Sequence, residues 1–300
     1  MRKYTHFFCP VFFALLLLPC LISGCKSAPL PNEEPLPVPA LAPFQPASFA
    51  LAFTGVEADD PANLRVFFVL EAQPPLPSGS SAKIASWQIE IDGEDAGSAF
   101  SLEYPEADNL SSNASIPFSL SMDVGALAAK GLAPRDDYNV TLITELDYSY
   151  GNNPPERVEV RSPAAFPGVQ APKFQITEIA ILQAELINTR FRVALMIDNP
   201  NPFPLELTSF SYELHGNGRF WARGAERNVI RVREKSTLVG NLMLVMNFID
   251  MDRALLNQII NLEDVNYRFI GAVQVSTGID FLPKFDDGFD ISGYSKVLDR

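Results

Sequence analysis

Apolar residues alternate with polar residues in many short segments of this chain, and this pattern constrains the fold more than any other feature. Period two places alternate side chains on one face of a β-strand, so each segment has one face to bury. Repeated at short spacing, the pattern is typical of an antiparallel β-sandwich. In the first half the apolar positions are Phe49, Leu51 and Phe53; Trp87, Ile89 and Ile91; Ile116, Phe118, Leu120 and Met122; and Val140, Leu142 and Leu146.

The same alternation returns in the second half, after a proline-rich segment, residues 161–172, that predicts a linker. The halves also match in order, because residues 63–68 correspond to 188–193 and residues 87–93 to 210–216. A spacing of about 125 residues indicates a duplicated domain, since solenoid repeats are much shorter. The second set of apolar positions is Phe191, Val193, Leu195 and Ile197; Phe210, Tyr212 and Leu214; Leu242, Leu244 and Met246; and Val265, Tyr267, Phe269, Val273 and Val275.

Each half is also predicted to contain one short helix. In the second half, Met251, Leu255, Ile259 and Leu262 fall on one helical face, with Asp250 placed to cap the first turn. Residues 123–130 have the same role, more weakly, in the first half. The halves are therefore expected to fold as residues 47–165 and residues 172–295.

The N-terminus has the layout of a signal peptide, predicted over residues 1–24. Arg2 and Lys3 precede an apolar run that is broken by prolines and is too short for a typical membrane-spanning helix. The run ends in Leu-Ile-Ser-Gly-Cys, which resembles the lipobox of bacterial lipoproteins. That resemblance implies cleavage before Cys25 and acylation of Cys25, for example with palmitate. The alternative is a plain secretory signal that contains cysteines.

Residues 25–46 are predicted to form a tether between the lipid and the folded part. Seven prolines lie between Lys26 and Pro46, and no apolar face is present, so the segment favours an extended polyproline conformation of up to roughly 60 Å. Several acyl chains together anchor a protein stably. Lys26 replaces the aspartate that retains many lipoproteins at an inner membrane, which favours an outer membrane over an inner one. The sequence does not decide between the periplasmic face and the surface face of that membrane.

Composition excludes several classes of function. The chain has 36 acidic against 23 basic residues, so nucleic acid is not an expected partner. Cys9, Cys20 and His6 leave with the signal, so no disulfide or cysteine–histidine metal site is expected, and no cofactor. The remaining histidine, His215, lies in a turn-like stretch and is interpreted as a solvated side chain rather than a base.

The most specific motif lies in the second half: Asn199, Pro200, Asn201, Pro202, Phe203, Pro204 and Leu205. Each proline removes a ladder donor, so the strand must leave its sheet here, and the asparagine side chains can bond nearby backbone instead. We interpret the motif as a structural device rather than a ligand site. Residues 72–80 occupy the matching place in the first half and lack both asparagines.

This motif resembles that of the late-embryogenesis-abundant group 2 family, also called the WHy (water stress and hypersensitive response) domain. The resemblance covers residues 172–295 well, and residues 47–165 only through the internal repeat. It implies an all-β fold of two tandem immunoglobulin- or fibronectin-III-like sandwiches. It also implies no catalytic residues, and a role in stress protection or interaction.

Motifs for enzymatic chemistry are absent or weak. The sequence has no Walker loop, dinucleotide fingerprint, zinc-protease motif or G-x-S-x-G elbow. Three acid pairs, 59–60, 136–137 and 286–287, could bind calcium weakly but fit solvated turns better. Arg223, Arg227, Arg231 and Arg233 form a basic stretch, interpreted as outward side chains that balance nearby acids; a patch for an anionic partner is the alternative.

Three functions remain open from the sequence. The favoured one is a non-enzymatic envelope lipoprotein that binds a protein, peptide or glycan, or that protects neighbouring molecules during water stress. The second is a structural or assembly subunit of an envelope complex. The third is a hydrolase that uses the carboxylates.

Overall fold

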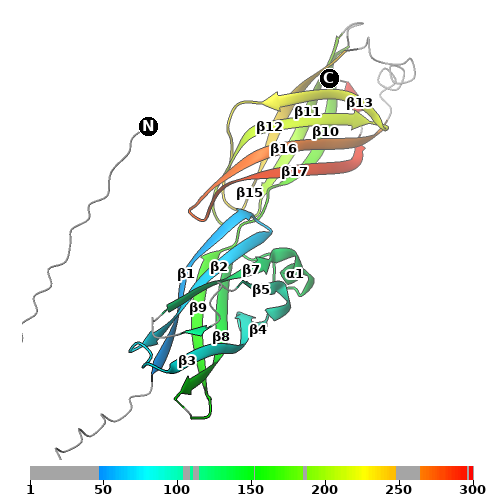
Figure 1. Cartoon of the computed structure of the whole chain (residues 1–300). Helices are drawn as coiled ribbons and strands as arrows, with labels where there is room; N and C mark the ends of the chain where they lie inside the picture. The colour runs from blue at the N-terminus through cyan, green and yellow to red at the C-terminus, as the bar shows by residue number, and fades with distance from the viewer. Residues whose placement is uncertain are drawn as a thin grey trace, which may run out of the picture. The chain divides into compact units, whose positions relative to one another are not determined.

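A computed structural model describes residues 47–103, 109–110, 115–151, 153–184, 188–247, 264–295 and 297–299. The predicted signal peptide, Cys25, the tether and the helix expected over residues 250–261 lie outside these residues. Within them, the chain is almost entirely β-strand, and it forms four sheets whose strand pairs are antiparallel with one exception. The predicted all-β antiparallel sandwich fold is therefore confirmed (Figure 1).

Two sheets are built from the first half of the chain. One has the order β1-β2-β7-β5, and the other has the order β4-β3-β8-β9, with the short β6 paired to β3. The strands are β1 (Ser48–Asp60), β2 (Asn63–Gln73), β3 (Ser80–Ile91), β4 (Glu94–Asp95), β5 (Phe100–Glu103), β6 (Asn109–Leu110), β7 (Ser115–Asp123), β8 (Asp137–Tyr150) and β9 (Glu156–Pro167). Two helical turns accompany them, the 3-10 helix η1 (Gly97–Ala99) and the α-helix α1 (Val124–Ala129).

The second half forms the other two sheets. Their orders are β15-β11-β10-β18, in which β10 and β18 run parallel, and β13-β12-β16-β17, with β14 paired to β12. The strands are β10 (Lys173–Ala184), β11 (Asn188–Asn199), β12 (Leu205–Gly216), β13 (Arg219–Glu226), β14 (Ile230–Val232), β15 (Ser236–Asn247), β16 (Val265–Ile279), β17 (Leu282–Ser295) and β18 (Val297–Asp299).

Each pair of sheets encloses its own hydrophobic core. The inward positions of the alternating segments fill both cores, as Phe68, Ile89 and Leu142 do in the first sandwich. Phe191, Phe210 and Phe269 are the matching large side chains of the second. Burial of these faces supplies the main favourable free energy of folding.

The two sandwiches use the same strand order. β1, β2 and β7 correspond to β10, β11 and β15, and β4-β3-β8-β9 corresponds to β13-β12-β16-β17. Even the small strands that pair off the main path agree, since β6 joins β3 and β14 joins β12. Among the described residues, two short strands differ: β5 adds to the edge of β7 and has no counterpart on β15, and β18 adds to β10 and has no counterpart on β1.

Two local predictions can be compared with the structure. The helix expected near residues 123–130 is α1, and the Asp123 carboxylate caps it by accepting from the Ala126 amide at 3.0 Å. The linker predicted over residues 161–172 is wrong in its first half, because β9 continues to Pro167. β9 is an edge strand, where proline is tolerated since no neighbour needs its amide on the outer side.

Candidate functional site

The motif Asn199–Leu205 lies where the chain crosses from one sheet of the second sandwich to the other. Asn199 is the last residue of β11 and Leu205 the first of β12. Pro200, Pro202 and Pro204 have no amide hydrogen, so the backbone of this crossover has too few donors for the carbonyl groups around it. Phe203 and Leu205 pack against the core after the crossover.

The Asn199 side chain is buried and replaces the missing backbone partners. Its amide nitrogen donates to the carbonyls of Phe203 at 2.8 Å, Arg233 at 2.9 Å and Val232 at 3.3 Å. Its oxygen accepts from the backbone amide of Asn201 at 2.9 Å. One side chain therefore joins the crossover to the end of β14 and the loop that follows it.

The Asn201 side chain is fully buried and holds the segment that precedes β10. Its oxygen accepts from the Gln170 amide, and its nitrogen donates to the Gln170 carbonyl, both at 2.8 Å. The Asn201 carbonyl also accepts from the backbone amide of Lys235 at 2.9 Å. The two asparagines are bonded to each other, with Asn201 Nδ2 3.0 Å from Asn199 Oδ1.

These bonds use the polar atoms of both asparagine side chains on the protein itself. A buried amide whose donors and acceptors are all satisfied stabilises one conformation and offers nothing to a ligand. The motif is thus arranged as an internal hydrogen-bond hub, and a partner would have to bind elsewhere on the molecule.

The matching crossover of the first sandwich is built differently. Residues 74–79 connect β2 to β3, and Leu76 is buried in the core. The turn closes through the Ser80 backbone amide, which donates to the Pro77 carbonyl at 3.0 Å. The Ser80 hydroxyl also donates to that carbonyl. No asparagine replaces the lost donors here, so the sequence departure at residues 72–80 is also a structural one.

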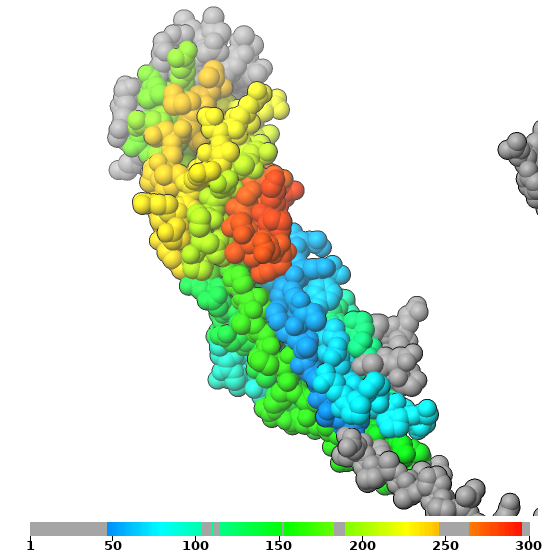
Figure 2. All heavy atoms as spheres, turned by 90° about the vertical axis from the view of Figure 1, so that its left-hand side faces the viewer, coloured from blue at the N-terminus to red at the C-terminus, as the bar shows by residue number. Residues whose placement is uncertain are grey.

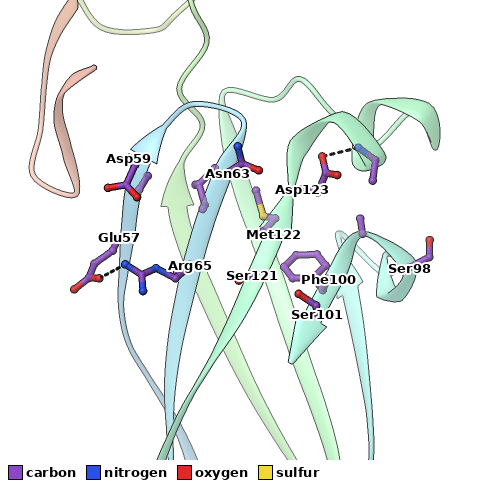
Figure 3. Close-up of a pocket in the computed structure, with 14 residues that line it drawn as sticks. Glu57, Asp59, Asn63, Arg65, Ser98, Phe100, Ser101, Ser121, Met122 and Asp123 are labelled. Carbon is purple, nitrogen blue, oxygen red and sulfur yellow. Dashed lines mark hydrogen bonds and ion pairs between the residues drawn. The ribbon is translucent and has the colours of Figure 1, made fainter. Parts of the chain in front are cut away.

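An open hollow of about 450 Å³, lined by both polar and apolar side chains, lies on the first sandwich, at one end of sheet β1-β2-β7-β5 (Figure 3). Its polar lining comprises Glu57, Asp59, Asn63, Arg65, Ser98, Ser101, Ser121 and Asp123. Arg65 pairs with Glu57 at 3.2 Å, and the Asp123 carboxylate turns to the helix that it caps. The hollow could hold a small polar group, and two of its three carboxylates already have partners.

The acid pairs do not assemble into a metal centre. Asp60 is used by its own turn, where its carboxylate accepts from the amides of Ala62 at 2.7 Å and Asn63 at 2.9 Å. Burial raises the pKa of Asp287, although the Gly288 amide lowers it in part. Among the residues that the structure describes, no cluster of three or more His, Cys, Asp or Glu could hold a metal ion.

His215 does not lie in a turn as predicted, because β12 continues through Gly216 before the chain reverses. Its ring stacks edge-on against Phe220, with 5.6 Å between the centroids, and its Nε2 atom lies 3.5 Å from Glu213 Oε2. The neighbouring Tyr212 is buried, and burial together with the nearby Glu226 carboxylate raises the pKa of Tyr212 to about 12. Sequence alternation predicted the burial of Tyr212, but the position of Glu226 depends on the pairing of β12 with β13.

The basic stretch lies on the outside of the second sandwich. Arg223, Arg227, Arg231 and Arg233 are all exposed. Arg223 lies opposite Glu213 in the strand pair, and Arg231 contacts Glu206 at 2.9 Å. Part of the stretch therefore balances acids on β12, as the sequence suggested, while Arg227 and Arg233 extend beyond that strand pair.

The described residues contain no helix long and apolar enough to cross a membrane. Any attachment to a membrane through Cys25 concerns residues outside those described.

Known proteins can be compared with this geometry. Residues 194–284 match the family described as Late embryogenesis abundant protein. The match includes the Asn199–Leu205 hub and most of the second sandwich, and it includes no part of the first. No curated protein matches the chain.

Several solved structures are similar to parts of the chain. A protein from Archaeoglobus fulgidus is 16% identical, with 43% of this chain and 96% of that one covered, at a TM-score of 0.28. A protein from Arabidopsis thaliana is 13% identical, with 45% and 86% covered, at a TM-score of 0.35. A structure named for the late embryogenesis abundant (LEA) proteins is 13% identical, with 43% and 72% covered, at a TM-score of 0.30.

Proposed function

We propose that this protein is a non-enzymatic binding or stress-protective module that lipid on Cys25 holds at a bacterial envelope membrane. The main support for a non-enzymatic role is the Asn199–Leu205 hydrogen-bond hub. The most specific motif of the chain makes its hydrogen bonds within the protein and leaves no polar side-chain group for catalysis. The family match over residues 194–284 includes this hub and supports a stress-related role. The proposed location, an outer membrane, rests on residues 1–46 of the sequence.

A binding role suits the first sandwich as well. Its hollow is open, and two of its three carboxylates serve an ion pair and a helix cap, which favours binding over acid–base chemistry. We propose that residues 47–165 are a divergent copy of the second domain, because the strand order is shared. Partners would be envelope proteins, peptides or glycans, and not nucleic acid, because the chain is strongly acidic.

Substitution of the anchor tests the location. Cys25→Ser should release the protein from the membrane fraction or stall its processing, because no lipid can be attached without the thiol. Cys20→Ser is the matched control, since it alters a cysteine within the signal and should leave fractionation unchanged. Correctly cleaved Cys25→Ser protein that still sediments with membranes would disprove the anchor.

A drying assay tests protection. A reporter enzyme dried with the full chain should retain more activity than with an equal mass of an inert protein. Equal recovery in both samples would rule out a general protective role and leave the binding role.

The second candidate is an assembly subunit of an envelope complex, and the exposed apolar side chains of β15 favour it. Under mild detergent extraction, an assembly subunit should co-purify with a stoichiometric partner. Recovery solely as a free monomer would count against this alternative.

A further inference from the structure

Exposed strand edges are usually protected, and most edges of this protein are. The described sheets have eight edge strands, of which β4, β5 and β18 are only two to four residues long. β1, β13 and β17 carry several charged residues, and β9 carries charges and two prolines. Short edges, charges and prolines are the usual devices that prevent another strand from pairing.

β15 lacks every one of these devices. It is twelve residues long, contains no charged residue and no proline, and pairs with β11 without a register shift. Its outward side chains Val239, Met243 and Val245 are 58%, 53% and 57% exposed. Among the described residues, no strand pairs with its other edge. Unpaired backbone groups and apolar side chains are thus presented together, which is what an added strand needs.

The first sandwich shows how this same edge is covered within the molecule. β7 is the counterpart of β15, and β5 pairs with it antiparallel from Phe100 opposite Met122 to Glu103 opposite Ser119. The Glu103 carboxylate accepts from the hydroxyls of Ser121 at 2.6 Å and Ser119 at 3.3 Å. A four-residue strand is therefore sufficient to occupy the edge.

A comparison of the outward side chains of β7 and β15 indicates which side chains a strand added to β15 should carry. When β2 and β11 are aligned at Asn63 and Asn188, Ser119 falls level with Met243, and Ser121 falls level with Val245. Two hydroxyls that hold a carboxylate in β7 are replaced by two apolar side chains. The complementary strand should therefore present apolar side chains on the outward face of the sheet, where β5 presents Glu103.

Basic residues around β15 suggest which charges the ends of the added partner strand should carry. Six basic and two acidic residues lie between Arg219 and Lys235, in a chain that is acidic overall. Beside β15 is a hollow of about 360 Å³, which is mostly apolar and whose charged lining residues are Arg231 and Glu226. On β11, Arg190 lies opposite Val245, and Arg192, which is ion-paired with Glu178, lies opposite Met243. Figure 2 shows the yellow and gold atoms of this region at the surface.

We propose that β15 binds an extended segment of a partner protein as an added antiparallel strand, with alternating apolar side chains between acidic ends. This inference rests on the proposed binding function and names the surface that performs it. A second copy of the chain suits the edge less well, because it would present β15 itself, which has no acidic residue at either end to pair with the basic stretch.

The test uses the purified full chain in mild detergent and a labelled synthetic peptide, Glu-Glu-Val-Thr-Val-Thr-Val-Glu-Glu. The variant M243S/V245S copies the serines of β7, so it removes the apolar contact without adding charge. It should weaken peptide binding by about tenfold, because two exposed apolar contacts are lost. Tyr294→Ser, which changes an exposed aromatic side chain on β17 whose hydroxyl donates to Asp264, should alter the dissociation constant less than about twofold.

Two further measurements complete the test. The same peptide with lysine in place of each glutamate should bind about tenfold more weakly, and Arg227→Glu together with Arg233→Glu should reverse that preference. Hydrogen exchange should show peptide-induced protection along β15 and not along β7. No binding to the wild-type chain, or equal binding to M243S/V245S, would overturn the proposal.

Analytical sedimentation of the chain without peptide tests the alternative that a second copy of the chain binds β15. A dimer that M243S/V245S abolishes would overturn the proposal in favour of a second copy of the chain, whereas a monomer supports the partner strand. Because the titration is done in solution, its result is independent of whether Cys25→Ser leaves the membrane. Failure of the anchor and failure of the docking strand are thus separate outcomes.

Discussion

The two sandwiches, residues 48–167 and 173–299, share the order of their main strands but differ at the crossover after the second strand and at both edges of one sheet, where β5 is added to β7 and β18 to β10. In the first, a serine turn closes the crossover and β5 covers the edge of β7. In the second, two buried asparagines hold the crossover, and the edge of β15 is uncovered among the described residues.

The comparison shows that two sandwiches with the same main strand order can share the character of their cores and still differ at crossovers and edges. Core positions must stay apolar and close-packed in both copies. Edges and crossovers are constrained only by their hydrogen bonds and by the groups that they contact, so the two sandwiches differ at these places.

The largest expected effect comes from the cores and tests whether they are independent. Phe68→Ala and Phe191→Ala should each cost about 3–5 kcal/mol, because both rings are fully buried and leave a cavity. Hydrogen exchange should show the loss of protection confined to the sandwich that carries the substitution. Phe220→Ala, at a half-exposed ring, is the control. Equal loss in both sandwiches would mean that the two cores unfold as one unit.

The second prediction contrasts the two crossovers. Asn199→Ala should cost about 3 kcal/mol or more, because the carbonyls of Phe203 and Arg233 and the Asn201 amide lose their buried partner. Ser80→Ala, which removes one hydroxyl bond from the first crossover, should cost about 1 kcal/mol. Urea denaturation measures both, with the exposed Asn228→Ala as control. If Asn199→Ala costs no more than Ser80→Ala, the hub does not hold the crossover.

The smallest effect depends on pH and concerns Tyr212, whose counterpart in the first sandwich is Ile89. The pKa of Tyr212 is raised to about 12 by burial and by Glu226, whereas an unfolded tyrosine ionises near 10. The unfolded state therefore binds fewer protons between these values, and the free energy of unfolding falls as the pH rises from about 10 to 12.

Tyr212→Phe should lessen this fall and leave the pH dependence below about 10 unchanged. Stability curves of the wild type and the variant, measured by urea denaturation across this range, check the prediction. Burial also raises the pKa of Tyr138, Tyr148 and Tyr267, but those contributions are common to both proteins and cancel in the difference. Parallel curves between pH 10 and 12 would contradict the assignment.

Much of the fold could be predicted from local pattern. Alternation located the strands because a sheet buries alternate side chains, and the helix predicted over residues 123–130 is present as α1. The end of β9 was mispredicted, since prolines suggest a linker unless the strand is known to be an edge. His215 was misplaced because of the nearby glycines: Gly216 is the last residue of β12, and the turn is formed by Asn217 and Gly218.

The candidate sites were less predictable. The motif at Asn199 to Leu205 was visible as a place where a strand must leave its sheet, but its bond partners Gln170 and Arg233 are about 30 residues away in the chain. The exposure of Met243 and Val245 could not be foreseen either, because alternation assigns a residue to one face and does not tell whether a further strand covers the edge.

The fold class and the place of the crossover could be predicted from the sequence alone, because these follow from short-range periodicity and from the backbone chemistry of proline and asparagine. Only the tertiary structure decided which strands lie at edges, which edge is left unpaired and which groups the two asparagines hold. Those properties depend on strand order, which pairs residues far apart in the chain and leaves no local pattern.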